Sequence, residues 1–263
     1  MSELLTTCEE AARVGGMVLQ AWVGRFSVRE KGPSDLVTQA DEAAQEAIRE
    51  VLLARFPDHG FVGEEQHSPT DVSSEFCWYV DPLDGTTNYV HQVPHYCTSV
   101  AVAKAGQVVA GAVFDPVSRE CYVAERGQGA FCNGVQLKTS PADDLSNALA
   151  AASFSSKVDP DSFEIDQFIL ALLEFQAVRR TGSAALNMCY VAGGRFDCFW
   201  ALTTKSWDVA AGSLFIEEAG GVITHWSGEV FDLERPHPAA SATPELHRRF
   251  LQLLARGQAR KSV

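Results

Sequence analysis

The stretch that decides the fold reads Trp78-Tyr79-Val80-Asp81-Pro82-Leu83-Asp84-Gly85-Thr86-Thr87-Asn88. It opens with aromatic and β-branched side chains, which is typical of a buried strand. Two aspartates then flank Pro82 and Leu83, and a turn is predicted there because proline fixes its own φ and disfavours a helical residue before it. Gly85 and the hydroxyl residues after it predict a helix start or a tight turn whose free backbone N–H groups can face an anion.

The two aspartates of this stretch indicate a cation site. Carboxylates held close together on a stiff turn are costly unless a cation lies between them. A set of oxygen ligands favours a hard ion, of which Mg²⁺ is the common choice. Acidic ligands beside an anion-binding turn therefore predict a metal-assisted site for a phosphate ester. An isolated Asp-x-x-Asp is also typical of solvated turns, so the prediction depends on the longer string and on two further acidic strings.

These three strings together resemble those of the inositol monophosphatase family, within the Mg²⁺-dependent, lithium-sensitive phosphatase superfamily. They are Gly63-Glu64-Glu65, Asp81 to Asn88, and Trp207-Asp208-Val209-Ala210-Ala211-Gly212 running on to Glu218-Ala219-Gly220-Gly221. Their order and spacing match the family, and the resemblance covers nearly the whole chain. It implies an α/β (α+β) fold, a layered αβαβα sandwich of the inositol monophosphatase and fructose-1,6-bisphosphatase type.

The chain of 263 residues is expected to form one domain, 1–263. Its sub-halves would be 1–142, with the metal and phosphate motifs, and 143–263, with the substrate-ring side and the last metal ligand. Hairpins come first and alternating strands and helices later, which agrees with a layered fold. The patterns predict helices over 2–24, 40–56, 163–175, 182–190, 209–219 and 244–254, and a loop over 89–95. They predict strands over 36–38, 61–63, 78–80, 97–103, 108–114, 120–124, 149–154, 177–179, 196–200, 222–224 and 230–231, with a tight hairpin turn at 127–130.

The resemblance implies the metal ligands. Glu64, Asp81 and the backbone carbonyl of Leu83 would hold one Mg²⁺, and Asp81, Asp84 and Asp208 a second. Glu64 would share a loosely bound third ion through water, giving two or three ions per site. If the resemblance is set aside, Glu64 is equally typical of a charged surface residue, and Asp208 is typical of a helix N-cap.

The resemblance also implies the catalytic residues. Thr86, oriented by Asp41, and Glu64 would orient an attacking water and help to deprotonate it. Glu65 would support the site without binding metal directly. Without the family, Asp41 fits a charge placed in the first turn of a helix whose N-cap is Thr38.

The substrate side is expected at two glycine-containing turns. Gly85 and Thr86 would bind phosphate oxygens through their N–H groups, with Asp84 and Thr87 beside them. In the family, the turn matching Gly182-Ser183-Ala184 lines the sugar or cyclitol ring, although Ser183 also fits a simple helix cap.

Two positions bear on substrate choice. Inositol monophosphatases usually carry a glutamate seven residues before the Trp-Asp aspartate, where it grips a ring hydroxyl, and here that position is Ala201. Loss of such a polar anchor can change discrimination strongly. Lys205 would favour a second anionic group, as in a bisphosphate, or it is a solvated loop lysine.

Charge and composition limit the partners and the compartment. A formal net charge of -13 argues against nucleic acid or an anionic membrane as the main partner, while bound divalent metal would still allow a phosphate substrate. The first residues lack a signal-peptide pattern, and no apolar run is long enough to span a bilayer. Seven scattered cysteines predict reduced, mostly buried thiols in a cytoplasmic protein. The resemblance implies a homodimer.

The predicted function is Mg²⁺-dependent hydrolysis of a small phosphate monoester, a phosphoric monoester hydrolase reaction, with inositol 1-phosphate as the family default. Alternatives on the same fold are another sugar phosphate, a bisphosphate, a nucleotide or histidinol phosphate. Relatives specific for phosphoadenosine phosphate or histidinol phosphate tend to carry lysine or arginine where Thr87 stands, so Thr87 favours the inositol branch. An alternative of another class is a non-catalytic binding or regulatory protein, which predicts a broken ligand set.

Overall fold

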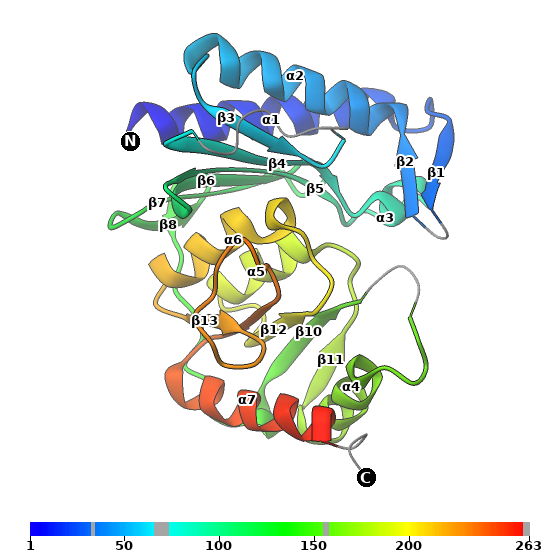
Figure 1. Ribbon diagram of the computed structural model, residues 1–263, viewed down its shortest axis with the longest axis vertical. Coiled ribbons are helices and arrows are strands. Elements are labelled where there is room, and N and C mark those ends of the chain that lie inside the picture. The colour runs from blue at the N-terminus through cyan, green and yellow to red at the C-terminus, as the bar shows by residue number, and fades with distance from the viewer. Residues whose placement is uncertain (33–34, 66–73, 155–157, 260–263) are drawn as a thin grey trace.

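The chain folds into five stacked layers, in the order helices, sheet, helices, sheet, helices (Figure 1). The computed structural model describes residues 1–32, 35–65, 74–154 and 158–259. The layered αβαβα architecture predicted from the sequence is confirmed. None of the helices among the described residues has the length and apolar character needed to cross a membrane.

The first outer layer and its sheet come from the N-terminal part of the chain. The helices are α1 (Glu3–Trp22) and α2 (Gln39–Arg55), and a two-stranded ribbon, β1 (Val28–Gly32) and β2 (Asp35–Thr38), joins them. The seven-stranded sheet has its strands in chain order, with short α3 (Thr86–Val90) between β4 and β5. Its strands are β3 (Gly60–Gly63), β4 (Phe76–Asp84), β5 (Cys97–Lys104), β6 (Gln107–Asp115), β7 (Glu120–Glu125), β8 (Gly129–Cys132) and β9 (Val135–Gln136).

The second half supplies the other sheet and the remaining helices. The five-stranded sheet has the order β11-β10-β12-β14-β13, with β10 parallel to both β11 and β12. Its strands are β10 (Leu149–Ser153), β11 (Ala177–Arg179), β12 (Cys198–Ala201), β13 (Val222–His225) and β14 (Pro238–Ser241). The helices are η1 (Leu145–Asn147, 3-10), α4 (Phe163–Glu174), α5 (Ala184–Ala192), α6 (Ser206–Glu218) and α7 (Pro244–Ala259).

Of the four hydrophobic clusters in the described part of the chain, the three largest lie between the layers. The outer face of the seven-stranded sheet, including Trp78, packs on α1 and α2, and the outer face of the other sheet, including Trp200, packs on α4 and α7. Helices α5 and α6 lie between the two sheets, where Leu214 and Phe215 are fully buried. A helix covered on both sides is apolar around most of its circumference, which explains the sequence of α6 after its first turn.

Most predicted elements are found within one or two residues of their predicted ends, but β4 ends four residues later than predicted, α6 begins three residues earlier and α7 ends five residues later. Thr38 is the N-cap of α2, as predicted, and the 127–130 turn joins β7 to β8. The predicted strand at 230–231 is wrong, because that segment is irregular and β14 pairs with β12 and β13 instead. The predicted loop over 89–95 begins too early, since α3 continues to Val90. All seven cysteines are unpaired, and all but the half-buried Cys132 are buried.

Candidate active site

The acidic stretch forms a bulge at the end of β4. Strand β4 runs through Asp84, and its pairing with β5 is irregular between Asp81 and Asp84. Pro82 therefore makes a bulge within a strand, where the sequence predicted a turn; bulges are one of the few places where a sheet accepts proline. The N–H of Leu83 donates to Asp81 Oδ1 at 3.0 Å, and the hydroxyl of Thr98 donates to the carbonyl of Pro82 at 2.9 Å. The first bond orients the Asp81 side chain, and the second fixes the backbone of the bulge.

Gly85 directs the chain from the strand into α3. Its φ is 102°, and a Cβ there would lie 3.0 Å from the carbonyl oxygen of His95, so a side chain would be strained at this position. The first N–H groups of a helix have no partner within it. Because Gly85, Thr86 and Thr87 all line one cavity, the start of α3 supplies backbone donors at the cavity wall.

Asp84 is held by the start of α5. Its Oδ2 accepts hydrogen bonds from the Ser183 hydroxyl and from the N–H of Ala185, both at 2.6 Å. Ser183 is fully buried and also caps α5, since its Oγ accepts from the N–H of Leu186 at 3.2 Å. Burial raises the pKa of Asp84 to about 6, while the hydrogen bond from Ser183 opposes the rise.

Helix α6 brings Asp208 to the same place. Asp208 is the third residue of α6, and its Oδ2 accepts from the N–H of Lys205 at 2.8 Å. The carboxylate thus caps the start of α6 by accepting a hydrogen bond from the backbone N–H of the N-cap residue. Because α6 packs against β4, β5 and β6, the start of the helix meets the end of the acidic strand.

Four carboxylates interact electrostatically at this junction. Burial raises the pKa of Asp81 well above its ordinary value, and the charges of Glu64, Asp84 and Asp208 raise it further. The pKa of Asp208 is also raised, first by burial and then by Asp84. The sequence placed these residues in one site, and the structure brings all four together.

The donor set fits a hard divalent cation. It consists of carboxylate oxygens and one backbone carbonyl, and the buried charges repel one another as long as nothing positive balances them. In the described part of the chain, no three His, Cys, Asp or Glu side chains are already arranged around a single point as direct ligands. Asp81 and Asp208 instead hydrogen-bond backbone N–H groups.

Thr86 lies between two acceptors. Its hydroxyl is 3.2 Å from the carbonyl oxygen of Leu83 and 3.4 Å from Asp41 Oδ1. Asp41 is fully buried, and its Oδ2 accepts from the N–H of Thr38 at 2.9 Å and from the Thr38 hydroxyl. Burial raises the pKa of Asp41 to about 6, and the hydrogen bond from the Thr38 side chain opposes the rise. The carboxylate that completes the α2 cap is therefore also the one nearest Thr86.

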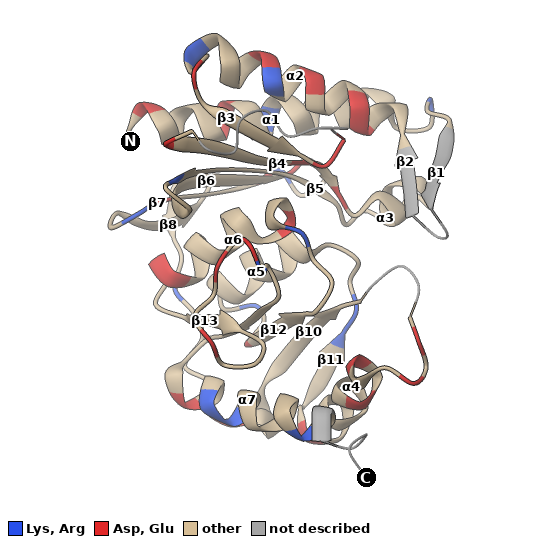
Figure 2. Cartoon of the chain, in the orientation of Figure 1, with Lys and Arg blue, Asp and Glu red and all other residues tan. Residues whose placement is uncertain are grey.

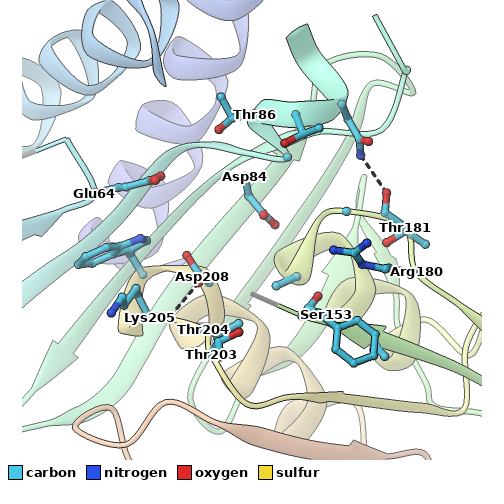
Figure 3. Close-up of a pocket in the computed structure, with 18 of the residues that line it drawn as sticks. Glu64, Asp84, Thr86, Ser153, Arg180, Thr181, Thr203, Thr204, Lys205 and Asp208 are labelled. Atoms are coloured by element: carbon cyan, nitrogen blue, oxygen red, sulfur yellow. Dashed lines mark hydrogen bonds between the residues drawn. The ribbon is translucent and has the colours of Figure 1, made fainter. Parts of the chain in front are cut away.

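A cavity of about 900 Å³ joins these elements (Figure 3). Of the residues predicted for the site, those on its wall are Glu64, Asp84, Gly85, Thr86, Thr87, Gly182, Ala184, Lys205 and Asp208. Asp41, Asp81, Leu83 and Ser183 are buried behind the wall. Ala201 is fully buried in β12 and is not part of the described wall, so the structure does not bring this predicted substrate-side residue to the cavity.

The inositol monophosphatase family profile matches residues 1–259. The chain belongs to the inositol monophosphatase family. Its enzyme class is that of the family, a phosphoric monoester hydrolase, as the sequence predicted.

Relatives of this family member carry two kinds of name. It is 40% identical over 222 residues to inositol-1-monophosphatase of Rhizobium meliloti, covering 83% of this chain and 81% of the relative. It is 36% identical over 251 residues to Nus factor SuhB of Pseudomonas aeruginosa, covering 92% and 93%. Among solved structures, the SuhB protein of Bartonella henselae superposes with a TM-score of 0.91 at 32% identity, covering 97% of this chain and 100% of that one.

Sequence reasoning missed several wall residues of this inositol monophosphatase family member. They come from α3 and the residue after it, from the ends of β10 and β12, from the segment before α5 and from the first turn of α6: Asn88, His91, Ser153, Phe154, Arg180, Thr181, Thr203, Thr204 and Trp207. Several of them are brought together by the parallel pairing of β10 with β12, which the sequence does not reveal. Carboxyl ends of adjacent parallel strands meet at one edge of a sheet, and ligands bind there.

Proposed function

We propose that this chain is a Mg²⁺-dependent phosphatase that hydrolyses a small phosphate monoester, with inositol 1-phosphate as the first candidate. The observation that carries the proposal is the meeting of Glu64, Asp81, Asp84 and Asp208 beside the start of α3. A site with acidic residues on one side and backbone N–H donors on the other suits a phosphate group accompanied by cations.

In this proposal the carboxylates bind the metal ions. Glu64, Asp81 and the Leu83 carbonyl would hold one Mg²⁺, Asp81, Asp84 and Asp208 a second, and Glu64 would share a third through water. When bound, the cations supply charge neutralisation for the phosphate and a lower pKa for water. The raised pKa values of Asp81 and Asp208 support the assignment, because these carboxylates gain most from a cation.

The chain's own groups would then orient the reactants. Thr86 donates its only hydroxyl proton toward Asp41 or the Leu83 carbonyl, which leaves its oxygen lone pairs free to accept from a water. Glu64, on the same wall, would take the proton that the water gives up. The N–H groups of Gly85 and Thr86 would bind phosphate oxygens, with Thr87 alongside.

No side-chain nucleophile is part of the proposed reaction. The Ser183 hydroxyl is occupied with Asp84 and with the cap of α5. Cys97 is fully buried, and burial raises the pKa of its thiol well above the ordinary value, which removes its nucleophilic form. We therefore expect direct attack by water without a phosphoenzyme.

The ring side of the substrate would contact the turn of Gly182, Ser183 and Ala184. Gly182 and Ala184 line the cavity, while Ser183 acts from behind through Asp84. Substrates other than inositol 1-phosphate, such as another sugar phosphate, a bisphosphate, a nucleotide or histidinol phosphate, remain alternatives, because Ala201 offers no ring anchor.

A phosphate-release assay across these monoesters, with and without Mg²⁺ and Li⁺, tests the proposal. We expect release only with Mg²⁺, inhibition by Li⁺, and loss of turnover in Asp81→Asn. The exposed Asp143→Asn serves as the matched control, since it removes the same charge outside the cavity. Metal-independent release from every substrate, or near-normal turnover of Asp81→Asn, would refute the assignment.

A regulatory binding role is a second candidate, because several relatives are named Nus factor SuhB. Inactivity of the wild type on every phosphate ester would favour it.

We further propose a cytoplasmic homodimer that does not use nucleic acid as its main partner. The formal net charge of -13 supports the last point, and Asp and Glu outnumber Lys and Arg on the outer helices α1, α2 and α4, although not on α7 (Figure 2). Light scattering tests the homodimer, and a binding titration with nucleic acid tests whether nucleic acid is a partner.

A further inference from the structure

The cavity has a basic wall opposite its acidic one. Glu64, Asp84 and Thr86 occupy one side of the view, and Arg180 projects from the segment before α5 toward the middle of the cavity, with Ser153 beside it (Figure 3). Neither Arg180 nor Ser153 has a role in the reaction proposed above. Its residues come from the C-terminal sheet and the turn that precedes α5.

Arg180 is an exposed arginine with no acidic partner among the described residues. By contrast, Arg195, Arg249 and Arg256 each form an ion pair with Glu or Asp. The guanidinium carbon of Arg180 lies 5.5 Å from the ring centre of Phe154, which also lines the cavity. A guanidinium against an aromatic face keeps its N–H donors available at its edge.

The backbone beside Arg180 is fixed on both sides. The carbonyl of Thr181 accepts from the side-chain amide of Asn88 at 2.9 Å, and the Thr181 hydroxyl donates to Asn187 Oδ1 at 2.7 Å. The first bond ties the segment to α3 and the second to α5. The backbone that carries Arg180 is thereby held at a defined place relative to Gly85 and Thr86, the proposed phosphate-binding turn.

Two hydroxyl groups extend the basic wall. Ser153 and Thr203 line the cavity, and in the described part of the chain neither side chain has a hydrogen-bond partner. The neighbouring Thr204 differs, since its hydroxyl donates to the carbonyl of Pro236. An arginine fork with free hydroxyls nearby is suited to the oxygens of a phosphate or carboxylate.

We propose that Arg180 binds a second anionic group of the substrate, so that the preferred substrates are phosphate monoesters with another phosphate or a carboxylate at the opposite end. The inference rests on the proposed phosphatase function and specifies its substrate class. Lys205 is less suited to this role. Its backbone N–H binds Asp208, and its side chain lies on the acidic side of the cavity (Figure 3).

Three six-carbon substrates that differ only at one end test the inference. Glucitol 6-phosphate ends in a neutral alcohol, gluconate 6-phosphate in a carboxylate, and glucitol 1,6-bisphosphate in a second phosphate. We expect the wild type to prefer one or both of the doubly anionic compounds in kcat/KM. Arg180→Ala should reduce kcat/KM for the preferred compound by roughly 10- to 100-fold through KM, and much less for glucitol 6-phosphate.

The neighbouring Arg179→Ala is the matched control. It is equally exposed, and its guanidinium donates to the carbonyl of Val178, outside the cavity wall. Arg179→Ala should retain the wild-type preference. Arg180→Lys should keep part of the preference that Arg180→Ala loses, because the positive charge remains while the bidentate geometry of the guanidinium is lost. Added salt should weaken the preference, as expected for a solvent-accessible ionic contact.

Two sets of outcomes separate this inference from the proposed function. Equal loss on all three substrates in Arg180→Ala, absence of any preference in the wild type, or loss of preference in Lys205→Ala alone would overturn the inference while the phosphatase stands. Absence of turnover on all three and on inositol 1-phosphate would overturn the function. In that case, calorimetric binding of the three compounds without metal decides the role of Arg180, and equal affinity in wild type and Arg180→Ala would reject it.

Discussion

The side-chain amide of Asn88 donates to the carbonyl oxygen of Thr181 at 2.9 Å, across a separation of 93 residues. The same amide donates to the carbonyl of His95 at 2.7 Å. One side chain therefore connects the α3 turn of the first sheet to the segment before α5 on the second. Together with the hydrogen bonds from Ser183 and Ala185 to Asp84, this contact sets the relative position of the two walls of the cavity.

Gly182→Ala is predicted to disturb that connection. The φ of Gly182 is +94°, and a Cβ would lie 2.8 Å from Asn88 Nδ2. Gly106 is the matched control, because its φ is +81° and nothing lies within 4 Å of its added Cβ. Gly106→Ala should lower the free energy of unfolding by about 1–2 kcal/mol through backbone strain. Gly182→Ala should lose at least about 1 kcal/mol more from overpacking and should raise KM. Equal losses in urea denaturation would show that the clash is relieved without cost.

The pH dependence of stability without metal is predicted from the acidic site. Burial raises the pKa values of Asp81 and Asp208, and that of Asp84 to about 6, above an unfolded value of about 3.9. Their contribution to stability is therefore present at low pH and is lost as pH rises through the folded values. Metal-free Asp81→Asn should be more stable than the wild type at pH 8, and the difference should shrink toward pH 5.

Mg²⁺ should reverse this order at pH 8. Cations that bind the folded wild type stabilise it by mass action, while Asp81→Asn would lack one of the proposed ligands. Thermal unfolding of both variants, with EDTA and then with Mg²⁺, provides the measurement. A wild type that is more stable than Asp81→Asn at pH 8 in EDTA would contradict the electrostatic account.

Thr86→Ala is predicted to lower kcat while leaving Mg²⁺ binding largely intact. The hydroxyl lies 3.4 Å from Asp41 Oδ1, and its removal leaves the four acidic side chains in place. A loss of roughly 100-fold or more is expected for a group that orients a reacting water. Thr86→Ser retains the hydroxyl and should recover most of the rate. Calorimetric Mg²⁺ affinity separates the two roles, and a large fall in that affinity would identify Thr86 as a structural support of the metal site.

The buried His247 is predicted to make the folded state less stable in acid. The ring is buried, its Nε2 lies 3.0 Å from the Thr224 hydroxyl, and its Nδ1 lies 3.1 Å from the Ser241 hydroxyl. Burial lowers the pKa of His247 to about 4, whereas the unfolded side chain takes up a proton near pH 6.5. The folded state therefore loses stability as pH falls from about 6.5 to 4. His247→Gln should show a shallower fall than the wild type in urea titrations over this range, and parallel curves would refute the assignment.

The acidic half of the site could be predicted because its signals are local in the sequence. One continuous stretch contains the strand residues Trp78 to Val80, the proline at position 82 and the glycine after Asp84. The family resemblance then supplied Glu64 and Asp208. The bulge itself was mistaken for a turn, since Pro82 restricts the backbone in both geometries and only the pairing with β5 distinguishes them.

The basic half could not be predicted in the same way. Arg180 and Ser153 share a wall only because β10, β11 and β12 are adjacent in the second sheet. Strand β14 was missed for a related reason. Its sequence, Pro-Ala-Ala-Ser, has little intrinsic preference for a strand, and pairing with β12 and β13 decides its conformation. The segment at 230–231 has the opposite character, with β-prone residues but no partner strand.

The place of Asp208 in α6 has a consequence for biosynthesis. A chain emerging from the ribosome delivers every strand of the first sheet before any of α6, so a nascent N-terminal half carries three of the four acids and no closed cavity. Prematurely terminated products that stop short of α6 would therefore be inert, whatever secondary structure they had reached. Enzymatic turnover would thus report that translation has passed α6 and that this helix has docked between the sheets.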